Sequence, residues 1–228
     1  MKIKGLTGNQ LKIIAMLTMT LDHIGAELFP QVLWLRIVGR LAMPIFAFMI
    51  AEGCRHTRSP LRYLGTLAAF AAVCQAVYFF AMGSLYMCIL VTFSMSVGLI
   101  LLLKKAEEKR APFLWILFAL GCAAAFFLCE ILPAYLPKTD YAVDYGFFGV
   151  MLPVLVYIGK GKWWQLFEAF FGLTLIANLY GGVQWWSLCS LPLLALYNGQ
   201  RGKWKMKWFF YIFYPAHLVA IHFIGMLM

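Results

Sequence analysis

Long apolar runs joined by short basic connections are the feature that most constrains how this chain folds. Hydrophobic residues fill 64% of its 228 positions and charged residues only 12%, whereas a soluble domain carries about 25% charged residues. That balance excludes a soluble globular enzyme, a disordered chain and a coiled coil. Because a helix needs about 20 residues to cross a bilayer, the chain supplies about nine crossings and has no room for a separate soluble domain.

We therefore expect an all-α protein, a polytopic membrane helical bundle of nine transmembrane helices that forms a single domain over residues 1–228. The apolar segments, in chain order, are Leu11–Phe29, Leu33–Ile50, Tyr63–Ala81, Leu85–Leu103, Phe113–Leu132, Tyr145–Ile158, Trp163–Leu179, Trp185–Leu196 and Phe209–Leu227. The sixth and eighth are short for a full crossing and are expected to be tilted, re-entrant or extended into the interface. The first is not expected to be a cleaved signal peptide, because Asp22 and His23 interrupt its apolar core.

The basic residues fall on alternate connections between these segments. Sixteen of the 19 Lys and Arg residues do so: Lys2, Lys4, Lys12, Arg55, Arg58, Arg62, Lys104, Lys105, Lys109, Arg110, Lys160, Lys162, Arg201, Lys203, Lys205 and Lys207. Lys138 lies on the other set of connections. Under the positive-inside rule, this alternation predicts a cytoplasmic N-terminus and an external C-terminus. The net charge of +10 is thus a topology signal, and no nucleic-acid partner is expected.

Polar side chains from four segments share one depth in the expected membrane, counted at about 1.5 Å per residue from the segment ends. They are Asp22, His23, Arg36, Arg40, Gln75, His217 and His222. An ionised side chain at the bilayer centre costs at least about 2.5–3.5 kcal/mol, so such residues are usually paired or face water. We expect this group to form the functional site.

Asp22 and His23 are adjacent in the sequence, so their side chains diverge by about 100° around a helix. We expect Asp22 to pair with Arg40 or Arg36 across the short outer connection. His23 is then left at the wall of a cavity, where an imidazole suits proton transfer near neutral pH. The alternative is an Asp–Arg staple between the first two segments, with a hydrogen-bonded histidine. Pro44 is expected to kink the second segment beside Arg40.

A polar run closes the second segment at its cytoplasmic end. It contains Glu52, Arg55, His56 and Arg58, and it is either a solvated loop that anchors the helix end or a site for a phosphorylated ligand. On the outer side, Asp144 opens the sixth segment, where it either lines a substrate entrance or caps the helix. The six cysteines show no CxxC spacing, and no metal site is expected.

Several stretches of the sequence resemble the landmarks of the TraX family. They are Leu11–Gly25, Arg36–Phe48 with its continuation Ala51–Gly53, Asp144–Gly149 and Tyr214–His217. The first two are long enough to be specific, and the likeness extends over nearly the whole chain. The resemblance implies a multi-span acetyltransferase that moves an acetyl group from cytoplasmic acetyl-CoA to an acceptor amine or hydroxyl outside. TraX proteins are associated with acetylating the N-terminus of conjugative pilin.

Carried onto this sequence, the resemblance implies that His23 is the catalytic base, with Asp22 beside it. Arg36 and Arg40 would shape the site or contact the carbonyl or pantetheine arm of the donor. Acetyl transfer from a thioester needs a base that deprotonates the acceptor and a cationic or hydrogen-bonding group for the developing oxyanion. His23 supplies the first, and Arg40 or His217 the second.

Tyr214 and His217 match the Tyr-Pro-x-His element of the family, which implies a supporting role for both. Gln75, Glu52 and Asp144 are further candidates for supporting the site.

The nucleotide of CoA is large and anionic, so we expect it to stay at the cytoplasmic surface while the pantetheine arm reaches the middle of the membrane. Contacts with the cofactor are expected from Arg36, Arg55, His56, Arg58 and Arg62. The acceptor stays open between a pilin N-terminus, a glycan, a peptide and a small amine. The lipid bilayer is the other expected partner.

Two other classes of function stay open. A proton-coupled transporter would use Asp22, His23 and Arg40 as a relay, although the paired broken helices typical of transporters are not evident in the sequence. A non-catalytic assembly factor for a surface appendage would need none of this chemistry.

Overall fold

The computed structural model describes residues 5–204 and 206–227, and every regular element in these ranges is helical. Three basic residues assigned above to cytoplasmic connections lie outside the described residues: Lys2, Lys4 and Lys205. The chain forms two compact units, Met1–Met49 with Gly159–Met228 and Ile50–Ile158, referred to below as unit 1 and unit 2.

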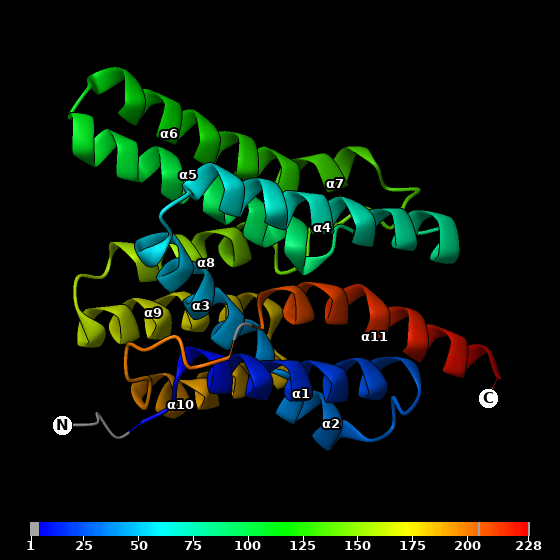
Figure 1. Cartoon of the computed structure of the whole chain (residues 1–228). Helices are drawn as coiled ribbons and strands as arrows, with labels where there is room; N and C mark the ends of the chain where they lie inside the picture. The colour runs from blue at the N-terminus through cyan, green and yellow to red at the C-terminus, as the bar shows by residue number, and fades with distance from the viewer. Residues whose placement is uncertain (1–4, 205, 228) are drawn as a thin grey trace. The chain divides into compact units, whose positions relative to one another are not determined.

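Unit 1 is built from the two ends of the chain (Figure 1). Its elements are α1 (Gly8–Glu27), α2 (Leu33–Gly39), the first half of α3 (Ala42–His56), α9 (Lys162–Tyr180), the 3₁₀ helix η2 (Gly182–Ser190), α10 (Leu191–Ala195) and α11 (Lys207–Leu227). α1 and α11 lie side by side and run in parallel. Near their beginnings, Lys12 Nζ lies 5.5 Å from the ring centroid of Phe210, and near their ends a Cβ on Gly225 would lie 3.3 Å from Leu28.

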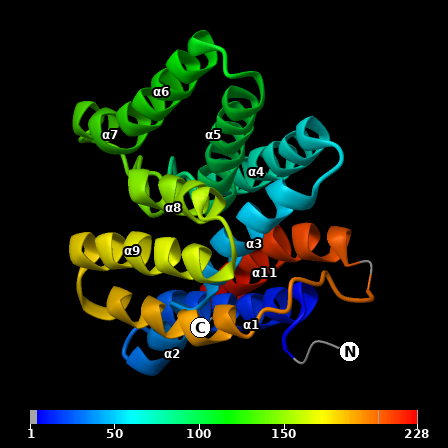
Figure 2. The same cartoon turned by 90° about the vertical axis from the view of Figure 1, so that its left-hand side faces the viewer.

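Unit 2 is centred on α5, which packs against α4, α6 and α8 (Figure 2). Its elements are the second half of α3, α4 (Pro60–Met82), α5 (Ile89–Lys109), α6 (Pro112–Phe126), the π-helix η1 (Phe127–Ile131), α7 (Leu132–Tyr135) and α8 (Gly146–Ile158). The hydroxyl of Thr92 donates to the carbonyl of Asp144 at 2.8 Å, and one turn later that of Ser96 donates to the carbonyl of Val150 at 2.7 Å. α5 and α8 therefore run in parallel.

Several helices have the character of membrane spans. Among the residues that the structure describes, five segments are long and apolar enough to cross a membrane: Leu33–His56, Pro60–Met82, Ile89–Lys109, Pro112–Tyr135 and Trp208–Leu227. α8 is apolar but shorter. Large apolar side chains face outward, as on α6, where Phe113, Ile116 and Leu120 are exposed. Such extensive apolar surface on helices of this length indicates a membrane protein.

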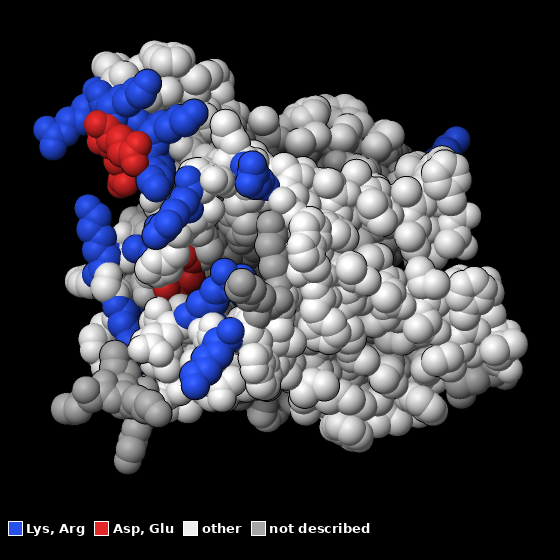
Figure 3. Space-filling model, viewed as in Figure 1, with Lys and Arg blue, Asp and Glu red and all other residues white. Residues whose placement is uncertain are grey.

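In unit 2, most of the basic side chains gather at one end (Figure 3), and Lys138 lies on the α7–α8 connection at the other. This end holds the connection from α3 to α4, with Arg58 and Arg62, and the turn from α5 to α6, which follows the basic run Lys104–Arg110. The opposite end holds the α4–α5 and α7–α8 connections, with Asp140 and Asp144. Within this unit, the two sets of connections predicted from the charge pattern lie at opposite ends of the helices.

Three of the expected segments are not continuous α-helices, and in the fifth segment the π-helix η1 follows α6. The second is interrupted at Arg40 and Leu41, and Pro44 lies in the first turn of α3, where a missing N–H costs little. The expected break beside Arg40 is thus confirmed. The eighth consists of η2 followed by α10. Because a 3₁₀ helix rises about 2.0 Å per residue, these two elements together reach about 25 Å, more than an α-helix with as many residues.

Candidate active site

α1 and α2 approach each other closely at two glycines. A Cβ on Gly39 would overlap the side chain of Asp22, and a Cβ on Gly25 would lie 2.7 Å from the Cβ of Leu35. Small residues of this kind let helix backbones approach in a membrane. Both glycines belong to the first two stretches that carry the family resemblance, and their packing allows Asp22 to reach the neighbouring helix.

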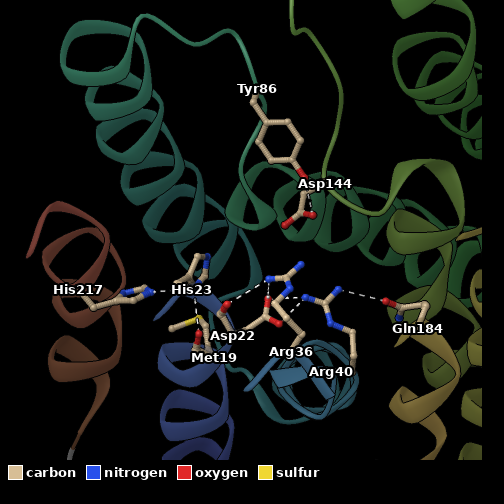
Figure 4. A network of polar contacts seen from close by, with 9 residues as sticks. All are labelled: Met19, Asp22, His23, Arg36, Arg40, Tyr86, Asp144, Gln184 and His217. Atoms are coloured by element: carbon tan, nitrogen blue, oxygen red, sulfur yellow. Dashed lines mark hydrogen bonds and ion pairs between the residues drawn. The ribbon is translucent and has the colours of Figure 1, made fainter. Parts of the chain in front are cut away.

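Asp22 forms ion pairs with two arginines of the α2 region (Figure 4). Nη2 of Arg40 donates to both carboxylate oxygens, to Oδ1 at 2.5 Å, and Nη1 of Arg36 lies 2.9 Å from Oδ2. The side chains of Asp22, Arg36 and Arg40 are 15%, 30% and 11% exposed. The predicted pairing is confirmed, and both arginines take part. The carboxylate of Asp22 therefore lies between two guanidinium groups in a largely buried place.

The second amino group of Arg40 contacts a residue that the sequence prediction missed. Nη1 of Arg40 donates to Oε1 of Gln184 at 3.2 Å, and Gln184 is buried on η2. A glutamine inside an apolar segment is a signal in itself, because an amide needs a partner there. Gln184 was overlooked because the eighth segment is short for a membrane crossing. In addition, Arg40, the partner of Gln184, lies 144 residues earlier in the chain.

The imidazole of His23 points away from this ion cluster and toward α11 (Figure 4). Its Nδ1 lies 2.9 Å from the carbonyl oxygen of Met19 and 3.3 Å from Nε2 of His217. The two rings meet edge to face with 5.0 Å between their centroids, and Nδ1 of His217 lies 3.0 Å from the carbonyl oxygen of Phe213. The expected divergence of His23 from Asp22 is therefore confirmed.

The hydrogen-bond network fixes the tautomer of both rings. A carbonyl oxygen only accepts, so Nδ1 carries the hydrogen in each ring, toward Phe213 in His217 and toward Met19 in His23. Nε2 of His217 then holds a lone pair and accepts from Nδ1–H of His23. Nε2 of His23 also holds a lone pair, and no hydrogen-bond partner for it occurs among the described residues. The imidazole of His23 thus presents a lone pair on Nε2, with a second imidazole next to its Nδ1.

His217 is held by aromatic neighbours on its own helix. Phe213 stacks on its ring at 5.2 Å with an angle of 9° between the planes, and Tyr214 meets it edge-on at 5.4 Å. Tyr214 and His217 are both buried. The Tyr-Pro-x-His element therefore places an aromatic clamp and an oriented imidazole behind His23.

Unit 2 contains a second cluster of similar composition. Glu52 pairs at 3.4 Å with both Arg55 and His56, and the three side chains are 8%, 24% and 70% exposed. Arg55 also donates to the carbonyls of Val156 and Tyr157 at the end of α8, at 2.9 and 2.5 Å. A cation at these last carbonyls is a C-terminal cap. Of the two interpretations of this run, the contacts of Arg55 fit the helix anchor.

The remaining candidates in unit 2 divide into exposed and bonded residues. Arg58 and Arg62 are exposed. Nε2 of Gln75 donates to the carbonyl of Tyr86 at 2.9 Å, and the Tyr86 hydroxyl donates to the carboxylate of Asp144 at 2.7 Å (Figure 4). Gln75 and Asp144 thus meet at the α4–α5 connection and join it to α4 and to the start of α8.

The stretch Asp144–Gly149 forms a tight entry into α8. Tyr145 and Gly146 both have left-handed backbone conformations, with φ of 59° and 55°, which favour glycine. A Cβ on Gly149 would lie 2.5 Å from the Cβ of Tyr145. The N–H of Phe147 donates to Glu130 at 2.8 Å, so Glu130 is a side chain that caps this helix. These contacts explain why the stretch has its particular residues.

Comparisons with known proteins agree with the likeness noted from the sequence. The family model described as TraX protein matches residues 7–225. The protein named Probable fimbrial assembly protein FimC, serogroup H1, from Dichelobacter nodosus is 26% identical over 244 residues, which cover 93% of each chain. An uncharacterised protein of Rickettsia prowazekii (strain Madrid E) is 53% identical over 38 residues, which cover 17% of this chain and 15% of that protein. No solved structure matches.

The family match covers the whole of the site in unit 1, from Asp22 and His23 on α1 to His217 on α11. It also spans all the stretches that resemble the family landmarks. The chain is a member of the TraX family.

Proposed function

We propose that this protein is an integral membrane acetyltransferase. It moves an acetyl group from cytoplasmic acetyl-CoA to an amine or hydroxyl at the outer side of the bacterial cytoplasmic membrane, with His23 as the base. The observation that carries this proposal is an imidazole with an open Nε2 on α1, one residue from the aspartate that pairs with two arginines. Acyl transfer from a thioester requires a base and a positive group for the oxyanion.

In the proposed step, the acceptor nitrogen or oxygen attacks the thioester carbonyl while Nε2 of His23 takes its proton. Negative charge develops on the carbonyl oxygen and is stabilised by Arg40, with the more exposed Arg36 beside it. The carbon–sulfur bond then breaks. The imidazolium of His23 returns the proton to the departing sulfur, which leaves as the thiol of CoA.

His217 is a positioning residue in this scheme. Its Nε2 accepts from Nδ1–H of His23, so it cannot at the same time donate to an oxyanion, the alternative role that the sequence left open. When His23 becomes charged, its Nδ1–H keeps two acceptors, Nε2 of His217 and the carbonyl of Met19. Both acceptors stabilise the imidazolium.

We further propose nine membrane crossings with a cytoplasmic N-terminus. The parallel course of α1 and α11 needs an odd number of crossings from the first of them to the last. The five long apolar segments, together with α1, α8, α9 and the η2–α10 segment, make up that number. Arg58, Arg62 and His56, at the basic end of unit 2, are then available on the cytoplasmic side for the phosphates of CoA.

For the acceptor, we favour the N-terminal amine of a pilin-type polypeptide. The relative from Dichelobacter nodosus bears the name of a fimbrial assembly protein, and an amine is a nucleophile that His23 can activate. A glycan, another peptide or a small amine has the same reactive chemistry.

The test uses the full chain purified in detergent. The protein is incubated with acetyl-CoA and a peptide that has a free N-terminal amine, and mass spectrometry follows the acetylated peptide while a thiol reagent follows released CoA. We expect both products in equal amounts from the unaltered protein and neither from His23→Ala, with similar thermal stabilisation of both proteins by CoA. Full activity of His23→Ala would remove the assigned base.

A non-catalytic role in assembling a surface appendage is the second candidate, and the printed name of the same relative favours it. This role predicts no stabilisation by micromolar CoA. It also predicts that His23→Ala still supports appendage assembly in cells.

A further inference from the structure

η2 is an unusually long 3₁₀ helix with a polar face. It extends over nine residues, whereas runs beyond three or four are uncommon. Its polar residues Gln184, Ser187 and Ser190 are spaced by three, which equals the number of residues in one 3₁₀ turn, so they lie in one row along the helix. At about 2.0 Å per residue, the row is about 12 Å long.

All three side chains are buried and incompletely bonded. Gln184, Ser187 and Ser190 are 4%, 0% and 0% exposed. Nε2 of Gln184 and both serine hydroxyls have no hydrogen-bond partner among the described residues. A buried amide or hydroxyl without a partner destabilises the fold, and a membrane interior offers no bulk water as a substitute.

Hydroxyls in the α-helices of this protein are bonded in a different way. Thr18 donates to the carbonyl of Ile14, and Ser94 donates to the carbonyl of Leu90, each one turn back on its own helix. This is how helical serines and threonines usually satisfy themselves in apolar surroundings. Since the two serines of η2 lack such bonds, their hydroxyls are free to bind something else.

The row begins beside the ion cluster, and the chain that follows it leads to a basic connection of unit 1. Gln184 lies at its start and bonds Arg40 (Figure 4), and the chain continues from Ser190 through α10 to the connection that carries Arg201 and Lys203. A ligand on this row would therefore have one end at the reacting group and the other near exposed cations. Its middle would be uncharged, because the row consists of one amide and two hydroxyls.

We propose that the polar face of η2 binds the pantetheine arm of the acyl donor. This inference rests on the proposed acetyl transfer. The arm is an uncharged chain with amide and hydroxyl groups at intervals, which match the unpartnered groups of Gln184, Ser187 and Ser190, and it joins a reactive thioester to an anionic nucleotide. Ordered water has similar hydrogen-bonding capacity, and the experiment below separates the two.

The experiment measures access to the row in the full chain in detergent. Ser187→Cys and Ser190→Cys are each treated with a charged methanethiosulfonate, with and without CoA, and the modification of each cysteine is read by mass spectrometry. Cys189, exposed on the same helix, is the internal control. Because Ser187 and Ser190 are fully buried in this structure, the proposal requires the row to open for the donor. We therefore expect labelling at positions 187 and 190 that excess CoA suppresses, and no effect of CoA at Cys189.

Each other outcome decides against the proposal. Labelling that CoA leaves unchanged, in protein that CoA still stabilises thermally, would mean that water alone fills the row, and acetyl transfer would stand. If neither cysteine is labelled in protein that CoA still stabilises, the polar face of η2 admits neither water nor donor. The pantetheine proposal would then fail, and acetyl transfer would stand. Failure of CoA to stabilise even the unaltered protein would overturn the proposed function and this inference together.

Alanine variants give a second readout. Because they remove unpartnered hydroxyls, Ser187→Ala and Ser190→Ala should fold and should raise the melting temperature without CoA. They should raise the KM for acetyl-CoA about two- to tenfold, the value of one or two lost hydrogen bonds, with kcat little changed. Cys189→Ala is the matched control and should change neither quantity. An unchanged KM in both serine variants would overturn the proposal.

Discussion

The protein contains two clusters made from the same kinds of side chain, one in each unit. In unit 1, Asp22 pairs with Arg36 and Arg40, and in unit 2, Glu52 pairs with Arg55 and His56. Both carboxylates are largely buried, and each lies next to an arginine that also bonds a third partner. The clusters differ in what that third partner is.

Arg55 bonds the last carbonyls of α8, which carry partial negative charge, so its own charge is balanced on two sides. Arg40 bonds the side-chain amide of Gln184 on η2 and shares the carboxylate of Asp22 with the second guanidinium group, that of Arg36. A helix terminus as third partner makes a cluster that joins helices, whereas two guanidinium groups around one carboxylate suit the oxyanion of the proposed reaction. The composition of a cluster alone therefore does not determine its role.

The largest effect is expected from Arg40→Gln, set against Arg55→Gln. The first change removes the guanidinium group assigned to the oxyanion, so kcat for acetyl transfer should fall about 10²–10³-fold, as for the loss of an oxyanion donor. The second change removes two bonds to α8 and should lower the free energy of unfolding by about 1–3 kcal/mol with kcat nearly intact. The measurements are kcat at saturating acetyl-CoA and thermal denaturation. Equal losses of kcat would break the distinction between the clusters.

Removing the carboxylate of each cluster should lower the free energy of unfolding more in unit 1 than in unit 2. Asp22→Asn removes the negative charge between two largely desolvated guanidinium groups and should cost about 3–5 kcal/mol. Glu52→Gln should cost less, about 1–3 kcal/mol, because Arg55 keeps the α8 carbonyls and His56 is exposed. Thermal unfolding of both variants checks the order. Adding Arg36→Met to Asp22→Asn should recover part of the lost free energy of unfolding, because it removes one of the two guanidinium groups that then repel each other. A double variant less stable than Asp22→Asn alone would contradict this explanation.

His217 tests whether the second imidazole of unit 1 orients the base. His217→Leu removes the acceptor behind Nδ1–H of His23 and should lower kcat about tenfold at unchanged KM, the cost of one hydrogen bond to a charged group. His217→Gln offers an oxygen acceptor and should recover most of the rate. His222→Gln, on the same helix, is the control. Equal rates for the Leu and Gln variants would reduce His217 to a packing role.

Features that depend on the spacing of residues along one helix or across one short connection could be predicted from the sequence. The pairing of Asp22 with arginines, the break beside Arg40 and the divergence of His23 follow from helix rise and rotation, which are local quantities. The glycines at positions 25 and 39 also lie in stretches that the resemblance marked, although their packing role appeared only in the structure.

Contacts between helices that are distant in the sequence could not be predicted. Depth arithmetic placed His217 level with His23, but their contact requires α11 to lie beside α1, which no local pattern states. The cap that Arg55 provides ends a helix about 100 residues later in the chain. Gln184 was missed because its segment is a 3₁₀ helix, whose period of three differs from the α-helical period assumed for a span.

A third carboxylate, that of Asp140, is fully exposed to solvent. We expect its removal to change the stability of the protein less than the removal of Asp22 or Glu52. The hydroxyl of Ser84 donates to it at 2.5 Å and the N–H of Leu85 at 2.8 Å. These bonds, that of Ser84 first, lower the pKa of Asp140 below its ordinary value of 3.8. The folded protein therefore binds fewer protons here than the unfolded chain, so the contact stabilises the fold above pH 3.8 and is lost as the pH falls through the lowered pKa.

Asp140→Asn should therefore lower the melting temperature slightly at neutral pH and make its decline below pH 3.8 less steep. Ser84→Ala should do the same, and melting curves across this range check both. Because the contact joins two connections at one end of unit 2 and touches neither cluster, kcat should stay unchanged. A fall in kcat would mean that the end of unit 2 that holds Asp144 takes part in transfer, and the division between a structural and a reactive unit would then fail.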